Sequence, residues 1–177
     1  MTFFGVGTVI FAIASSSAFL SLPVYLNNTV LLTPSVTFAV FMFTSLFGAL
    51  SYVIVERLSS GWRAGNAIKV ASFIRAVLAI LFLSLAFSSF FAPIVAVMLL
   101  SAAAFSASIY SVDRNTIIMD YSAEGTVGVH GALNRSGIVI GRLLTGLIPT
   151  IFGFNILFIT ASLLFFVSFT IFWKSVS

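Results

Sequence analysis

The sequence predicts an all-α polytopic membrane protein with six transmembrane helices. Hydrophobic residues make up 60% of the 177 residues and charged residues only 7%, whereas a soluble domain carries about 25% charged residues. The apolar residues come in repeated runs near the ~20 residues that a helix needs to cross the hydrocarbon core of a bilayer. We therefore expect residues 1–177 to form a single six-helix bundle whose main partner is the lipid bilayer.

The first three expected spans are apolar runs separated by turn-forming or charged residues. The first covers about 3–26 and ends before the polar pair Asn27–Asn28. The second covers about 35–55 and ends at the basic segment 56–69. The third covers about 70–90.

The last three expected spans are divided by a polar segment and a tight turn. The fourth covers about 94–112 and is followed by the polar segment 113–123. The fifth covers about 125–152, the turn Gly153–Asn155 follows it, and the sixth covers about 156–173.

The distribution of basic residues predicts the orientation of these spans. In the six-span arrangement every loop Lys and Arg falls on one side of the membrane, which the positive-inside rule identifies as cytoplasmic. We therefore expect a multi-pass protein of the plasma membrane with both termini in the cytoplasm. Basic residues spread among apolar spans form no patch for nucleic acid, so we expect no nucleic-acid partner. The residues behind the orientation are Arg57, Arg63, Lys69, Arg114 and Lys174.

Only two residues, neither of them basic, precede the first span. Two interpretations stay open: the chain begins inside a longer one, or later loops set its orientation.

The fifth span combines glycines with arginines. At about 100° per residue, Gly137 and Gly141 share one face of the helix, and Arg135 and Arg142 lie on the opposite side. Small residues spaced four apart let a neighbouring helix approach closely in a bilayer. Arginine is costly against lipid, so its side should face protein, water or an anion. The pattern predicts one packing face and one polar face.

Two motifs resemble the C-terminal six-helix half of a major facilitator superfamily transporter. The stronger, NTIIMDYSAEGTVGVHGALNRSGIVIGRLLTGLIP at 115–149, resembles the end of that family's tenth helix, a charged turn and its glycine-spaced eleventh helix. The weaker, GALSYVIVERLSSGWRAG at 48–65, is similar to the loop between the second and third helices of each half. The resemblance implies cytoplasmic loop or gating roles for Glu56, Arg57, Gly61, Arg63, Asp120, Glu124 and Arg135.

The resemblance also implies a function. In that family two six-helix bundles rock around a central site and carry a small solute across the membrane by alternating access. A chain of six spans would then need an N-terminal six-helix half or a second copy of itself. It implies no cofactor.

Arg142 is the main candidate for contact with the solute, which would then be anionic. If the fifth helix enters the hydrocarbon near Gly131, Arg142 lies about 16 Å further along, near the middle of a core about 30 Å thick. Either it binds or gates an anion, or it is a snorkelling or structurally paired arginine. Tyr25 and Ser106 are further candidates for solute contact. Arg75, about 9 Å from Lys69, is expected to snorkel to the interface.

The residues for enzyme chemistry are few. The chain has no cysteine and one histidine, His130, and no cluster of metal-binding residues, so we expect neither a metal site nor an enzyme. The carboxylates are expected at the cytoplasmic ends of helices: Glu56, Asp113, Asp120 and Glu124. A non-transporting scaffold, an orphan fragment and, more remotely, an intramembrane hydrolase stay open as alternatives.

Overall fold

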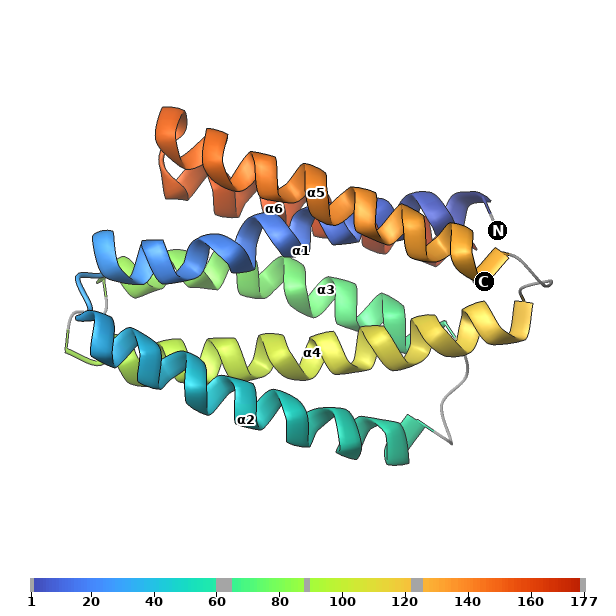
Figure 1. The fold of residues 1–177 in the computed structure, drawn as a ribbon, viewed down its shortest axis with the longest axis horizontal. Coiled ribbons are helices and arrows are strands. Elements are labelled where there is room, and N and C mark those ends of the chain that lie inside the picture. Colours follow the sequence, from blue (N-terminus) through green and yellow to red (C-terminus); the bar gives the residue numbers. More distant parts are fainter. Residues whose placement is uncertain (1, 60–64, 88–89, 122–125, 176–177) are drawn as a thin grey trace.

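The computed structural model describes residues 2–59, 65–87, 90–121 and 126–175. These residues are almost entirely helical, and six helices are long and apolar enough to cross a membrane (Figure 1). The predicted class, an all-α polytopic membrane protein, is confirmed. The helices are α1 (Thr2–Asn28), α2 (Pro34–Leu58), α3 (Asn66–Leu81), α4 (Ala92–Tyr121), α5 (Thr126–Phe152) and α6 (Phe154–Ser175), and the 3-10 helix η2 (Phe82–Phe87) continues α3.

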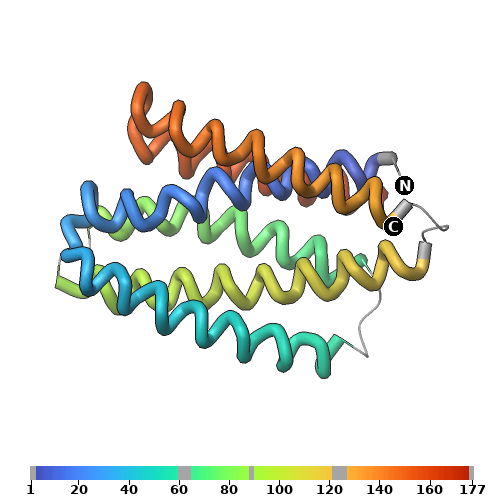
Figure 2. Tube along the Cα trace, in the orientation of Figure 1, coloured from blue at the N-terminus to red at the C-terminus, as the bar shows by residue number. Residues whose placement is uncertain are grey.

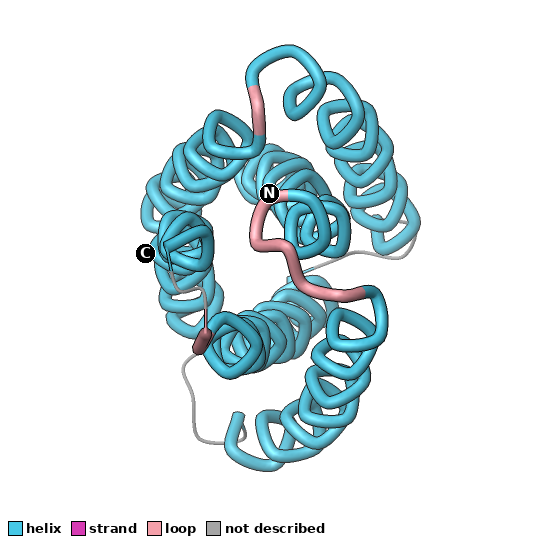
Figure 3. The backbone as a smooth tube through the Cα atoms, turned by 90° about the vertical axis from the view of Figure 1, so that its left-hand side faces the viewer, coloured by secondary structure: helices cyan, strands magenta, loops and turns pink. Residues whose placement is uncertain are grey.

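The helices pack side by side in an order that differs from their order in the sequence. Helix α1 packs between α5 and α6, α3 packs between α6 and α4, and α2 packs on α4. The order across the bundle is therefore α5, α1, α6, α3, α4, α2. Figure 3 views the helix bundle from one end. The turns α1–α2 and α5–α6 lie at one end of the bundle, and both chain termini lie at the other (Figure 2).

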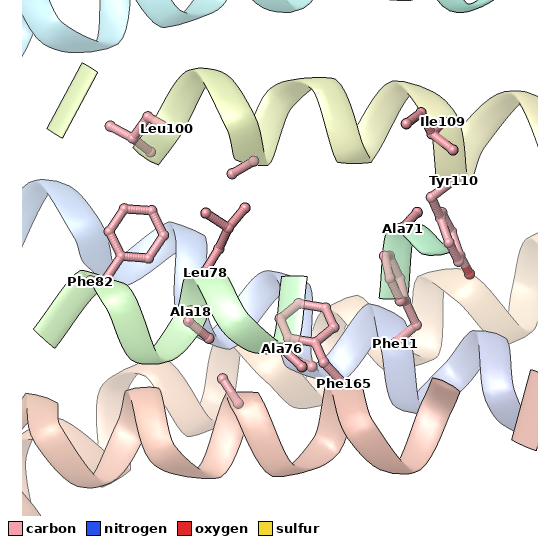
Figure 4. Close-up of a cluster of buried hydrophobic side chains, with 14 of the residues drawn as sticks. Phe11, Ala18, Ala71, Ala76, Leu78, Phe82, Leu100, Ile109, Tyr110 and Phe165 are labelled. Atoms are coloured by element: carbon pink, nitrogen blue, oxygen red, sulfur yellow. The ribbon is translucent and has the colours of Figure 1, made fainter. Parts of the chain in front are cut away.

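Aromatic and small residues from α1, α3, α4 and α6 form the core. Phe11 and Tyr110 stack with ring centroids 3.5 Å apart (Figure 4), and Phe165 meets Phe11 edge to face at 5.2 Å. Alanines such as Ala71 and Ala79 are fully buried. The small residues let the helix backbones come close, as is usual where hydrophobicity alone does not drive helices together in a bilayer.

Two glycines of α5 lie directly against α1. A Cβ atom built on Gly137 would lie 2.6 Å from the Val9 carbonyl oxygen, and one on Gly141 would lie 2.5 Å from the Ile13 carbonyl oxygen. The hydroxyl of Thr145, one turn further on, lies 3.4 Å from the carbonyl oxygen of Ser16. No larger residue fits at 137 or 141 without separating the two helices.

Three helix boundaries differ from the sequence prediction. Helix α4 continues to Tyr121, so the predicted polar segment 113–123 is helical as far as its described residues go. Helix α3 begins at Asn66 rather than near 70, and its regular part ends at Leu81, after which η2 takes over. The start of α3 and the part of α4 that continues past 113 meet at one side chain, the carboxylate of Asp113.

Asp113 of α4 caps the N-terminus of α3. Its two oxygens each accept a hydrogen bond from the Gly65 amide at 3.1 Å, and one also accepts from the Ile68 amide at 2.7 Å. Gly65 has φ of 91°, which favours glycine. The side chain is buried and two turns before the end of α4, which corrects the expectation that it lies at a helix end. Asp113 bonds to the start of a neighbouring helix, and its own helix continues past it.

Candidate functional site

A groove of about 340 Å³ lies between α1, α4 and α5, with one side chain of α3 at its inner side. Among the described residues, its walls carry three arginines and no Asp or Glu. The lining residues are Phe11, Ala12, Ser15, Ser16 and Leu20 of α1, Arg75 of α3, Ala107, Tyr110, Ser111 and Arg114 of α4, and Asn134, Ile138 and Arg142 of α5.

Each wall of the groove follows helical spacing. On α4, positions 110 and 111 each lie three or four residues from both 107 and 114, and on α5 positions 134, 138 and 142 are four residues apart. Residues at such spacing lie on one face of a helix. Small residues of α1 and α4 leave room for the groove, and the longer side chains of arginine and asparagine line it.

Arg75 holds the inner side of the groove. Its Nε donates to the Ser106 hydroxyl at 3.2 Å, one terminal nitrogen donates to Ser15, and the other to the Ala103 carbonyl at 3.2 Å. The guanidinium also lies 4.7 Å from the ring centre of Phe19. All these partners are neutral, so they stabilise the cation without cancelling its charge.

The expectation that Arg75 snorkels to the interface is wrong. The residue is 5% exposed and its guanidinium bonds to α1 and α4. Because α3 begins at Asn66, Arg75 lies about 14 Å along the helix, too far in for its side chain to return to the nearer interface. The neutral acceptors on two neighbouring helices make this depth tolerable.

Tyr110 and Arg114 lie on the α4 wall of the groove. The guanidinium of Arg114 lies 5.9 Å from the ring centre of Tyr110, and its Nη2 donates to the Asn115 side chain at 3.2 Å. The Tyr110 hydroxyl and the Arg114 Nε are both buried and have no hydrogen-bond partner in the described part of the chain. Both atoms are enclosed by protein, and the side chains of Thr8 and Arg114 lie next to the Tyr110 hydroxyl.

Arg142 lies on the open side of the groove. It is exposed, and it is ten residues from the end of α5 at Phe152, about 15 Å. Asn134 and Ile138 precede it on the same wall. The helix thus brings the main sequence candidate to the groove at a depth near the middle of a bilayer core about 30 Å thick.

The two other candidates for solute contact have different surroundings. Ser106 is buried, accepts from Arg75 and donates to the Ala103 carbonyl at 2.8 Å, so it positions Arg75 from behind the groove. Tyr25 does not line the groove: it is fully buried, and its hydroxyl donates to the Phe82 carbonyl at 3.1 Å. Its ring meets that of Phe158 at 4.9 Å, so Tyr25 packs α1 against η2 and α6.

The residues expected to form a cytoplasmic gate are described only in part. Glu56, Arg57, Asp120 and Arg135 are exposed and none lines the groove. Gly61, Arg63 and Glu124 lie outside the described residues. The gating role therefore stays a prediction.

The sequence analysis missed Ser15, Tyr110 and Arg114 as groove residues. The signal was present in α4, where Tyr110, Ser111 and Arg114 lie on one helical face within an otherwise apolar and alanine-rich segment. It was hidden because the expected end of the helix fell at 112. No sequence pattern identifies Ser15, since its contact with Arg75 joins residues 60 positions apart.

Comparison of the chain with protein-family models, with curated proteins and with solved structures finds no match. The resemblance to the major facilitator superfamily therefore rests on the two sequence motifs alone.

Proposed function

We propose that this membrane protein is one six-helix half of a secondary transporter of the major facilitator type, and that a small solute binds in the groove between α1, α4 and α5. The observation that carries the proposal is the position of Arg142. It is exposed on the open side of a groove at a depth near the middle of the bilayer. An arginine facing lipid at that depth costs about 2.5–3.5 kcal/mol or more, so this side of the bundle is expected to face water, a solute or another protein.

The size and lining of the groove support a solute site. Its volume of about 340 Å³ falls within the roughly 300–1,000 Å³ of small-molecule sites. Phe11, Leu20 and Ile138 supply apolar walls, and the arginines and serines supply hydrogen-bond donors. Few, well-placed polar groups on apolar walls are typical of such sites.

The proposal requires a second six-helix bundle over the open side of the groove. Helices α5 and α2 are the two ends of the packing order, and α5 barely touches α4. A second copy of the chain or a separate six-helix unit would cover this side, and rocking of the two bundles would open the groove to each face of the membrane in turn. In this arrangement both termini are cytoplasmic and the protein lies in the plasma membrane.

Uptake into proteoliposomes tests the proposal. The purified chain is reconstituted, incubated with a defined mixture of small carboxylates, phosphate esters, sugars and amines, and the washed lumen is analysed by mass spectrometry. At least one solute should accumulate with the wild-type chain but not in protein-free liposomes, and Arg142→Leu should abolish its accumulation. Equal lumen contents in wild-type and protein-free liposomes, for a chain shown by cross-linking to pair with itself, would overturn the proposal.

A further inference from the structure

We infer that the groove binds the carboxylate or phosphate group of a small organic anion, which Arg75, Arg114 and Arg142 hold together. The inference rests on the proposed function for the claim that this anion is transported, but the charge of the groove stands independently of it. Three arginines line one groove of about 340 Å³, and no Asp or Glu of the part of the chain that the structure describes lines it.

Arg75 brings a buried positive charge to the groove. All its hydrogen-bond acceptors are serine hydroxyls or a backbone carbonyl, so its unit charge is not neutralised within the bundle. A buried cation attracts an anion far more strongly than one in water, because the surrounding dielectric is low. An anion in the groove supplies the neutralisation that the bundle lacks.

Arg75 also has hydrogen-bond donors that it does not use within the described residues. A guanidinium has five N–H donors, and Arg75 uses one on each of its three nitrogens, which leaves two. The Nε of Arg114 and the hydroxyl of Tyr110 are buried beside the groove and make no well-formed hydrogen bond in the described residues, although the side chains of Thr8 and Arg114 neighbour that hydroxyl. Buried donors without partners are costly, and an anion accepts hydrogen bonds from several donors at once.

The apolar walls define the rest of the ligand. Phe11, Leu20, Ile138 and Ala107 line the groove next to the arginines. They offer contact to a hydrocarbon or aromatic portion and no hydrogen bonds. The site thus favours a small organic anion over an inorganic ion.

An anionic group can reach the groove from two sources. Because the groove is open on one side within the membrane region, its anionic group could come from a water-soluble solute or from the phosphate of an anionic lipid. The test below separates the two.

The chain contains no cysteine, so single cysteines can measure the local charge. Ser111→Cys, with Ala107→Cys as a second position, places a thiol on the groove wall, and Asn155→Cys places a reference thiol at the exposed start of α6. Each variant, in nanodiscs of phosphatidylcholine, reacts with a methanethiosulfonate that carries a sulfonate and with one that carries a trimethylammonium group. The ratio of the two rates reports the local preference for anions.

The anion-to-cation rate ratio in the groove should exceed that at Asn155→Cys by about tenfold or more. Adding Arg142→Gln or Arg75→Gln should return the ratio most of the way to the reference, whereas Lys174→Gln, a charge change at the end of α6, should leave it unchanged. If Arg75→Gln does not give a monodisperse protein, Arg142→Gln decides, since that side chain is exposed. A ratio at both groove positions no higher than the reference, no reaction with either reagent, or indifference to the arginine variants would overturn the inference.

Two compounds, added separately, identify the source of the anion. Benzoate, but not its neutral analogue benzamide, should slow the sulfonate reagent at Ser111→Cys if the anion is a solute. Phosphatidylglycerol in the nanodisc should slow it instead if the anion is a lipid phosphate. An anion preference without uptake of any solute would support the anion site and refute transport. Uptake of a neutral solute without an anion preference would support transport and refute the anion site.

Discussion

Arg75 and Arg142 carry charges of the same kind into the bilayer region in two different ways. Arg75 is enclosed and bonded to neutral groups, whereas Arg142 is exposed on the groove wall. Removing one partner of a buried ion pair leaves an unpaired charge behind and costs about 3–5 kcal/mol. No Asp or Glu in residues 2–59, 65–87, 90–121 and 126–175 lines the groove, so neither arginine should show that penalty.

This difference gives a test at Arg142. Arg142→Leu should abolish solute uptake and change stability by no more than about 0.5 kcal/mol, as for an exposed site without partners. Arg142→Lys keeps the charge but loses the planar fork, so it should weaken binding by about tenfold without abolishing it. Uptake and melting temperature measured on the same preparations decide. A melting temperature lowered as for a broken ion pair would assign Arg142 a structural role, and unchanged uptake would exclude it from the solute site.

Asp113 offers a second test at the residue scale. Asp113→Ala removes the acceptor for two backbone amides at the start of α3. Loss of a helix cap costs about 0.5–2 kcal/mol, and leaving buried amides unpaired adds to it, so thermal stability in detergent should fall clearly. Asp120→Ala, an exposed site on the same helix, is the matched control and should be near neutral. Equal melting temperatures for the two variants would mean that water replaces the cap.

At the scale of the element, α5 has glycines in two kinds of surroundings. Gly137 and Gly141 meet the backbone of α1, but a Cβ atom at Gly128, Gly131 or Gly146 would have no neighbour within 4 Å. The first two are required by packing, and the other three only lower the helix propensity of α5. The same substitution should therefore act in opposite directions along one helix.

Gly141→Ala and Gly146→Ala test this. A methyl group at 141 would overlap the Ser16 hydroxyl, and overpacking of this kind costs about 1–3 kcal/mol. At 146 the same change should raise stability slightly, by up to about 1 kcal/mol. Melting temperatures in detergent give both values. A Gly141→Ala variant as stable as Gly146→Ala would contradict the close α1–α5 contact.

Much of the element-level structure follows from the sequence, and the exceptions share one cause. Apolar runs predict the number of spans, because helix length and bilayer thickness are matched. The start of α3 and the end of α4 were misplaced because the Asp113 carboxylate bonds to backbone amides at the start of another helix. A pattern along one helix cannot show whether a polar residue ends the helix or bonds to a neighbour.

At the scale of the molecule, the candidate site is formed by helices distant in sequence. The groove joins α1, α3, α4 and α5, and the sequence indicated only the α5 wall with Arg142. Helical spacing predicts which residues share a wall, but not which walls meet. The order α5, α1, α6, α3, α4, α2 supplies that information.

The orientation of the molecule in the membrane is open to direct measurement. Positive-inside topology places Asn28 and Asn155 outside and Asn66 inside, and all three are exposed. Cysteines at 28 and 155 should react in intact cells with an impermeant thiol reagent, and Asn66→Cys should react only after permeabilisation. The absence of native cysteine removes background labelling. Reaction at Asn66→Cys in intact cells would reverse the proposed orientation.

The contacts of α3 also bear on how the chain enters the membrane during synthesis. When α3 leaves the ribosome, the carboxylate that caps its first turn and the Ala103 carbonyl that binds Arg75 belong to α4, which is not yet made. A central arginine alone costs a span about 2.5–3.5 kcal/mol on insertion. We expect α3 to enter the bilayer poorly by itself and efficiently as a hairpin with α4. Glycosylation mapping of nascent chains that end after η2 or after α4 would show this, and equal insertion of α3 in both would refute it.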